Sequence, residues 1–253
     1  MIVWVASYPR SGNAYFLLLL NWVYGVRLRS MYGGDETEEG KRMVEVMGED
    51  RDAFLGALSE SRDVYAVKTH DVPYGDDFPA IYLVRDGRDA LVSYAHYLLA
   101  TELGISAGRD STAFQDVLRS LIFYRESSVG GFHGWSGNVL AWAARRARTV
   151  VVRFENLIRD PIRTVEWAWT AAGQMGERTD ISLPTFQELR ERYPLSFRRG
   201  QIGSWRTEMS DRLHELFWEH HGPAMRAMQY DGARLRRGLW WARKHLRRGS
   251  WAP

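Results

Sequence analysis

The chain has 253 residues, which is enough to bury a substantial core in one or two domains. It carries 34 Lys and Arg against 31 Asp and Glu, and a net charge of +3 is too small to indicate nucleic-acid binding. The lack of cysteine excludes disulfides, thiolate zinc sites and cysteine nucleophiles. No apolar run reaches the roughly 18 residues that span a bilayer, and no basic region typical of a signal peptide precedes the first one. We therefore expect a soluble, cytoplasmic protein.

The first twenty residues predict a buried strand, a tight loop and a helix. The apolar run 2–6 is followed by Ser7-Tyr8-Pro9-Arg10-Ser11-Gly12-Asn13 and then by the helix-forming segment Ala14–Leu20. Such a loop directs several backbone N–H groups and the positive end of the helix dipole to one place. With Arg10, Ser11 and Asn13 beside it, that place would suit a phosphate or sulfate. An ordinary strand–turn–helix with a solvated loop is the alternative.

The rest of the chain alternates short apolar runs with helical patterns. Further strands are predicted at Val64–Val67, Ile81–Val84 and Thr149–Val152. Helices are predicted at Glu36–Met47, Asp52–Ser61, Arg88–Leu103, Thr112–Arg125, Asn138–Arg148, Pro161–Ala172, Thr185–Arg192 and Ser210–His220. The alternation predicts an α/β fold with a mainly parallel central sheet flanked by helices.

Charged and polar side chains follow the predicted strands, where parallel α/β folds bind their ligands. They are Arg10, Lys68, His70, Arg85 and the segment 153–155. Gathered around one cleft, the cations would neutralise an anionic ligand, although each alone could be a surface residue. His70 is the candidate general base because imidazole titrates near neutrality, and a structural histidine is the alternative.

Two further patterns indicate phosphate binding. Ser93 follows Arg85 by about two helical turns, so both side chains could share one phosphate. The basic segment Pro194–Trp205 contains Arg198, Arg199 and Gly200, which combine charge with backbone donors. Alone, this segment could also be an exposed loop. No cluster in the sequence has the spacing of a metal site.

Together these segments resemble the cytosolic-type sulfotransferases, which use 3′-phosphoadenosine 5′-phosphosulfate (PAPS). The resemblance rests on five motifs in family order, which span about the first 220 residues. They are the 5′-phosphosulfate loop at 7–13, the Lys-x-His segment Lys68-Thr69-His70, the 3′-phosphate segment Val84–Tyr94, the stretch from Arg153 to Pro161, and the element Phe197–Trp205. The resemblance implies a single sulfotransferase domain at 1–230 with a P-loop-like strand–loop–helix, followed by a basic amphipathic tail at 231–253.

The resemblance also implies a role for each matching residue. The 5′-phosphosulfate would be held by Arg10, Ser11, Gly12, Asn13 and Ala14, and the 3′-phosphate by Arg85, Ser93, Arg198, Arg199 and Gly200. The adenine would lie against Tyr15, Phe154 and Phe186. His70 would be the base, and Lys68 would stabilise the transferred sulfuryl group. Arg10 stands where the family usually has a lysine, so it would act through charge and hydrogen bonds rather than as a proton donor.

The implied activity is transfer of the sulfuryl group from PAPS to a hydroxyl of a small, partly apolar acceptor, without a metal. One alternative is a P-loop kinase or NTPase, but the loop lacks the first glycine and the lysine of Gly-x-x-x-x-Gly-Lys-Ser/Thr. The other is a non-catalytic binder of anionic nucleotides or membranes. The segment Arg234–Arg248 of the tail could make peripheral membrane contact, or it could pack on the core. The stretches 31–48, 71–78 and 97–135 are rich in aromatic residues, Met and Gly, and we expect them to line the acceptor pocket. Nothing in the sequence identifies the acceptor or the oligomeric state.

Overall fold

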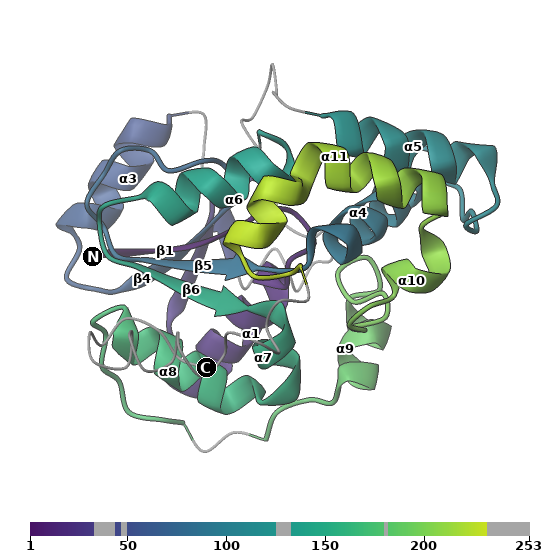
Figure 1. Cartoon of the computed structure of the whole chain (residues 1–253). Coiled ribbons are helices and arrows are strands. Elements are labelled where there is room, and N and C mark those ends of the chain that lie inside the picture. Colours follow the sequence, from purple (N-terminus) through teal and green to yellow (C-terminus); the bar gives the residue numbers. More distant parts are fainter. Residues whose placement is uncertain (33–43, 47–49, 125–132, 180–181, 232–253) are drawn as a thin grey trace, which may run out of the picture.

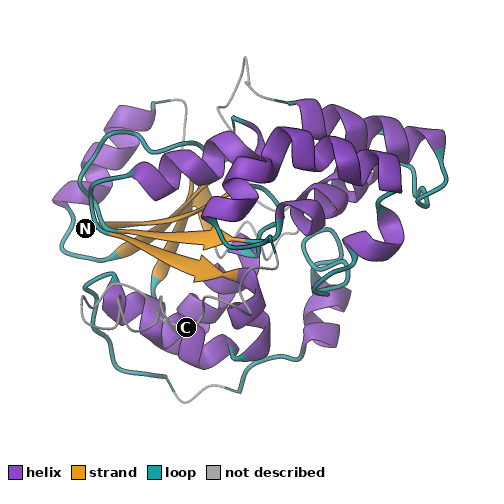
Figure 2. Ribbon diagram, in the orientation of Figure 1, coloured by secondary structure: helices purple, strands orange, loops and turns teal. Residues whose placement is uncertain are grey.

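The computed structural model describes residues 1–32, 44–46, 50–124, 133–179 and 182–231. Their centre is a six-stranded sheet in the order β3-β2-β4-β1-β5-β6, in which neighbouring strands are parallel (Figure 2). The strands are β1 (Ile2–Ser7), β2 (Arg27–Ser30), β3 (Val44–Val46), β4 (Tyr65–Thr69), β5 (Ala80–Val84) and β6 (Thr149–Arg153). The predicted α/β fold with a parallel sheet is confirmed.

Helices cover both faces of the sheet (Figure 1). One face carries α3 (Arg51–Glu60), α4 (Gly87–Glu102), α5 (Thr112–Phe123), α6 (Gly134–Ala144) and α11 (Asp211–Ala227). The other carries α1 (Asn13–Tyr24), α7 (Phe154–Arg159) and α8 (Pro161–Ala171). The helices α9 (Phe186–Arg192) and α10 (Trp205–Glu208) lie beyond the sheet on the side where β5 and β6 end.

The central strand β1 divides the core into two clusters because its side chains alternate between the faces. Ile2, Trp4 and Ala6 pack with the cluster under α4 and α11, whereas Val3 and Val5 pack with the cluster under α1 and α8. All six residues of the strand are buried. A continuous apolar run is what a parallel strand covered on both faces requires.

The sequence missed two strands. β2 has the polar sequence Arg-Leu-Arg-Ser, and β3 has three residues, so neither carries a long apolar run. Both extend the sheet beyond β4 through backbone pairing. The predicted helix Glu36–Met47 is wrong at Val44–Val46, and most of its other residues lie outside the described part of the chain.

Tertiary packing also moved or added helices. The predicted helix Asn138–Arg148 instead spans Gly134–Ala144, and its early start places Trp135 fully inside the core. The short helices α7 and α10 were not predicted. α11 continues seven residues beyond His220, with Pro223 inside it. Its later residues Ala224 and Met225 are fully buried, so packing outweighs the local cost of the proline.

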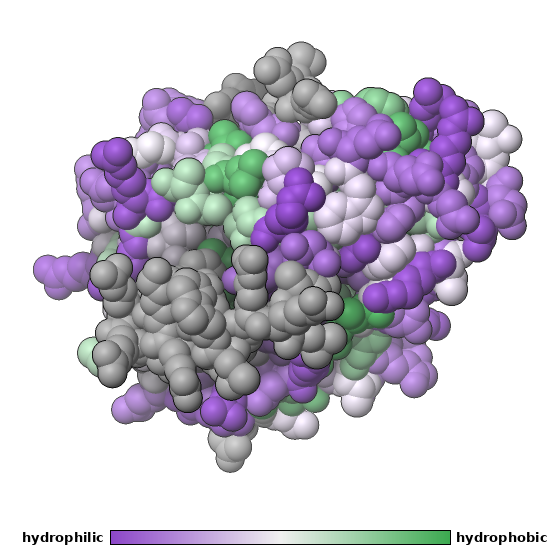
Figure 3. Space-filling view, in the orientation of Figure 1, coloured by the Kyte–Doolittle hydropathy of each residue, from purple (hydrophilic) through white to green (hydrophobic). Residues whose placement is uncertain are grey.

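The surface drawn in Figure 3 is mostly hydrophilic, with separate smaller hydrophobic areas. Within the described ranges, no helix is both long enough and apolar enough to cross a membrane. The predicted basic tail lies outside these ranges apart from its first residue.

Gly87, the first residue of α4, has no room for a side chain. A Cβ there would lie 2.7 Å from Cδ2 of Trp135 and 2.8 Å from Cζ of Phe217. Gly87→Ala is therefore expected to destabilise the fold by about 1–3 kcal/mol through overpacking, measured by urea unfolding. Gly56→Ala in α3 is the matched control, because a Cβ there meets nothing within 4 Å. It should be neutral or stabilise the fold by up to about 1 kcal/mol. Equal stability of the two variants would contradict this description of the core.

Candidate functional site

The carboxyl ends of the central strands open into a cavity of about 870 Å³. Its lining includes every predicted site residue except Ser11, which is buried outside it. These lining residues are Arg10, Gly12, Asn13, Ala14, Tyr15, Lys68, His70, Arg85, Ser93, Phe154, Phe186, Arg198, Arg199 and Gly200. Residues that lie up to 190 positions apart in the sequence thus share one cavity at the edge where parallel sheets bind ligands.

The loop between β1 and α1 is tightly wound. Arg10 has φ 65° and Gly12 has φ 97°, and a Cβ at Gly12 would lie 2.8 Å from the Phe154 ring. The Asn13 amide donates to the carbonyl of Val5 (3.0 Å) and to Oγ of Ser7 (3.2 Å). Asn13 therefore fastens the loop to the strand, and the start of α1 is held against the cavity, where a helix N-terminus favours anions.

His70 follows β4, and its ring orientation is fixed by β1. Its Nδ1 lies 2.8 Å from the carbonyl oxygen of Ser7. A carbonyl only accepts, so Nδ1 carries the proton and Nε2 carries the lone pair. The His70 backbone N–H donates to the Tyr32 hydroxyl (3.1 Å), and the Tyr32 ring stacks on the imidazole at 5.7 Å between centroids. The imidazole therefore has a fixed orientation and a fixed tautomer.

Three effects keep the imidazole neutral. Burial is the largest effect, and together with the positive charges of Lys68 and Arg10 it lowers the pKa of His70 to about 3, against the opposing hydrogen bond to Ser7. A neutral imidazole can accept a proton throughout the physiological pH range.

Arg10 extends across the cavity from the β1 loop to α4. Its Nε donates to Oγ of Ser93 (3.4 Å), and its Nη2 donates to the carbonyl of Ser196 (3.1 Å). The guanidinium also lies 5.0 Å from the centroid of the Tyr97 ring. Arg10 thus joins the first loop to the segment that precedes Arg198.

Arg85 is buried, with 6% of its surface exposed, and it joins two loops. Its Nη1 donates to the carbonyl of Arg10 and its Nη2 to that of Gln201, each at 3.0 Å. The guanidinium lies 4.2 Å from the centroid of the Phe154 ring. Burial lowers the pKa of Arg85, and Asp89 is the strongest of the carboxylates that oppose this shift.

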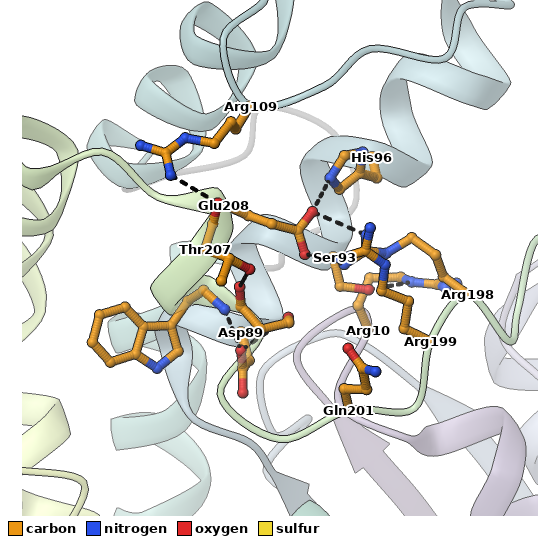
Figure 4. Close-up of polar contacts among 12 residues, drawn as sticks. Arg10, Asp89, Ser93, His96, Arg109, Arg198, Arg199, Gln201, Thr207 and Glu208 are labelled. Carbon is orange, nitrogen blue, oxygen red and sulfur yellow. Dashed lines mark hydrogen bonds and ion pairs between the residues drawn. The ribbon is translucent and has the colours of Figure 1, made fainter.

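Arg198 and Arg199 share one carboxylate, that of Glu208 at the end of α10. Arg198 donates from Nη1 and Nη2 to the two carboxylate oxygens, and Arg199 donates from Nη1, all at 3.0 Å. His96 contacts the same carboxylate, with Nε2 2.6 Å from Oε2 (Figure 4). These contacts hold both arginines at the cavity wall.

Asp89 of α4 anchors the segment that carries these arginines. It is 1% exposed, and its oxygens accept from the backbone N–H groups of Gly203 (2.6 Å) and Trp205 (2.9 Å). The Ser204 hydroxyl donates a third hydrogen bond at 3.2 Å. The irregular segment predicted at Pro194–Trp205 is therefore irregular but rigidly held.

Aromatic residues form another part of the cavity wall. Phe197 packs edge-on against Tyr15 (5.9 Å between centroids) and against Phe186 (5.8 Å). Burial raises the pKa of Tyr15. Tyr15, Phe154, Phe186 and Phe197 all line the cavity. Planar aromatic walls of this kind suit a nucleobase.

The sequence did not point to Asp89 or Glu208. Tyr32 lies in the stretch 31–48 that was predicted to line the acceptor pocket, but its contact with His70 was not predicted. Asp89 lies inside the Arg85–Ser93 segment and Glu208 comes three residues after the basic segment, but only the fold brings each carboxylate to its donors.

Comparisons with known proteins identify the family of this chain. The family model described as a sulfotransferase domain matches residues 2–229. Sulfotransferase 1E1 of mouse is 21% identical over 252 residues, covering 88% of this chain and 82% of the relative. The rat protein of the same name is 21% identical over 249 residues, covering 86% and 81%. The crystal structure of mouse sulfotransferase SULT7A1 complexed with PAP superimposes with a TM-score of 0.63 at 16% identity, covering 89% of this chain and 84% of that one. The chain belongs to the sulfotransferase family.

Proposed function

We propose that this sulfotransferase moves the sulfuryl group from PAPS to a hydroxyl of a small, partly apolar acceptor, with His70 as general base. One observation carries the proposal: a single cavity joins the neutral imidazole of His70 to the cations Lys68, Arg85 and Arg198. A positioned base beside a set of anion-binding groups is what in-line transfer between two oxygens needs. The proposal assigns no metal and places the enzyme in the cytoplasm.

His70 would take the proton of the acceptor hydroxyl at Nε2. The bond between the acceptor oxygen and sulfur forms as the bond between sulfur and the 5′-phosphate oxygen breaks, and 3′,5′-adenosine bisphosphate leaves. The Ser7 carbonyl would stabilise the imidazolium that results, since it already accepts from Nδ1. Lys68 would balance the charge on the sulfuryl oxygens, and Arg10 the charge on the leaving phosphate.

The donor set fits a nucleotide that carries a 3′-phosphate. Among the described residues, four buried polar atoms of this region have no hydrogen-bond partner: Ser11 Oγ, Asn13 Oδ1, Arg85 Nε and Arg198 Nε. Buried donors are rarely left unpaired, so the two arginine nitrogens are suited to an anionic oxygen. A 3′-phosphate near Arg85, Ser93 and Arg198 would use them.

The acceptor would enter beside Tyr32, which stacks on His70. Tyr94 and Tyr97 of α4 and Leu28 of β2 also line the cavity. These side chains support a partly apolar acceptor such as a phenol or an alcohol. Of the stretches 31–48, 71–78 and 97–135 that were predicted to line the acceptor pocket, residues 33–43, 47–48 and 125–132 lie outside the described residues.

The direct test is transfer of label from ³⁵S-PAPS to a panel of phenols and primary and secondary alcohols. The expected products are a labelled sulfate ester and the bisphosphate, formed in equal amounts. Tight binding of the bisphosphate with no product above the enzyme-free rate for any acceptor class would contradict catalysis and favour a nucleotide binder.

The pH profile should show the lowered pKa of His70. An ordinary histidine base loses activity below about pH 6.5, but one with a pKa near 3 stays neutral well below that point. The value of kcat/KM for PAPS reports the pKa values of the enzyme without bound nucleotide. We therefore expect that protonation of His70 causes no fall in kcat/KM between pH 6.5 and pH 5.

Lys68→Gln supplies the matched variant. Removing the Lys68 charge should raise the pKa of His70 and bring its acid limb to higher pH. The fold must be checked at each pH, because the unfolded chain takes up a proton at His70 below about pH 6.5 and the folded chain does not, so stability falls with acid. If the activity of Lys68→Gln falls at the same low pH as that of the wild type, the Lys68 charge does not lower the pKa of His70.

A further inference from the structure

The Glu208 carboxylate is built into the wall that the proposed function assigns to the 3′-phosphate. Glu208 is 7% exposed, and four hydrogen bonds hold it. Two come from Arg198 and one each from Arg199 and His96 (Figure 4). Arg198 thus offers both of its Nη atoms to this carboxylate, in the bidentate geometry that a phosphate would also use.

Glu208 is ionised at neutral pH. Burial raises its pKa, but hydrogen bonds from His96 and Arg198 and the Arg198 charge outweigh that effect and bring the pKa to about 2. A full negative charge therefore lies within hydrogen-bond distance of the two guanidinium groups that would bind a dianionic phosphate. The charge neutralises part of their attraction for a phosphate.

We propose that Glu208 competes with the 3′-phosphate for Arg198 and Arg199, and so sets how tightly the nucleotide binds and how readily the bisphosphate product leaves. This inference rests on the proposed function. Glu208 acts through the arginines, so it is a positioning residue rather than a catalytic one. The His96 contact keeps it in place when the arginines turn toward a phosphate, because that hydrogen bond comes from α4 and not from the arginine segment.

Like charges a few ångströms apart raise the energy of the bound complex, and the repulsion is larger in a partly buried site than in water. Glu208→Gln keeps the size of the side chain and one oxygen acceptor while removing the charge. The affinity for 3′,5′-adenosine bisphosphate should therefore rise, by about tenfold for one screened like charge. The affinity for 5′-AMP, which has no 3′-phosphate, should stay within about twofold.

The experiment is calorimetric titration of the full chain with both nucleotides. The readout is the ratio of the dissociation constant for 5′-AMP to that for the bisphosphate, which should rise in the Glu208 variants. A merely structural role for Glu208 would weaken the binding of both ligands together and leave this ratio unchanged. Glu219 is an exposed residue of α11 outside the cavity lining. The substitution Glu219→Gln is therefore the matched control for loss of one negative charge. Its ratio should equal that of the wild type.

Glu208→Ala is a second variant with the same charge change, in case the glutamine disturbs the arginines. A rise in the ratio in both Glu208 variants supports the inference. An unchanged or lower ratio in folded variants, with the wild type still preferring the bisphosphate, overturns the inference and leaves the proposed function standing. A wild-type protein that binds the bisphosphate no better than 5′-AMP overturns both.

Discussion

Replacing His70 by alanine is expected to lower kcat for sulfuryl transfer by about 10²–10⁴-fold, the usual contribution of a positioned general base. The imidazole lines the cavity, carries its lone pair on Nε2, and is held by Ser7 and Tyr32. No neighbouring histidine can replace it in the described part of the chain, since the cavity lining contains His70 and no other histidine. The loss should appear in single-turnover measurements with saturating PAPS.

Nucleotide binding should survive the same change. His70 contributes no charge at neutral pH, so the dissociation constant for the bisphosphate is expected to stay within about threefold of the wild type. His220→Ala is the matched control, because His220 packs on Phe123 and lies outside the cavity. Its kcat should be unchanged. Full turnover in the His70 variant would show that another group, or the solvent, takes up the proton of the substrate hydroxyl.

Replacing Arg85 by alanine is expected to weaken bisphosphate binding by about 100-fold or more, the cost of removing one partner of a buried charged contact. The guanidinium holds the carbonyls of Arg10 and Gln201 together and leaves Nε for the ligand. The binding of 5′-AMP should weaken much less, because it has no 3′-phosphate. Calorimetric titration with each nucleotide measures both effects.

Arg85→Lys separates charge from geometry. Lysine keeps the positive charge but lacks the planar fork that reaches two carbonyls at once, so it should restore only part of the affinity. If Arg85→Ala binds the bisphosphate as tightly as the wild type does, the 3′-phosphate must bind elsewhere in the cavity.

The sequence predicts the sheet well where strands carry a continuous apolar run. β1, β5 and β6 are apolar over most of their length, and each was predicted within one or two residues. β2 was missed because its two arginines interrupt the apolar pattern, although Leu28 is buried and the strand pairs with β4. Pairing to a neighbour, rather than its own sequence, makes that segment a strand.

The candidate site was predicted from residues that lie in motifs, and the structure places nearly all of them around one cavity. The exception is Ser11, which is buried and lies outside the cavity lining. Asn13 lines the cavity, and its amide also fastens the loop to β1. Glu208 could not be predicted, because its contacts with His96 bridge 112 positions of the sequence and no spacing rule reports them.

The identity of the bound nucleotide is the central prediction, and a thermal-shift titration tests it directly. A ligand that binds only the folded state raises the melting temperature according to its affinity. We expect 3′,5′-adenosine bisphosphate to raise it strongly and Arg85→Ala to abolish the shift, whereas ATP with Mg²⁺ and 5′-AMP should have little effect. A strong shift with ATP and Mg²⁺, together with no response to the bisphosphate, would contradict the proposed use of PAPS and favour a kinase-like activity.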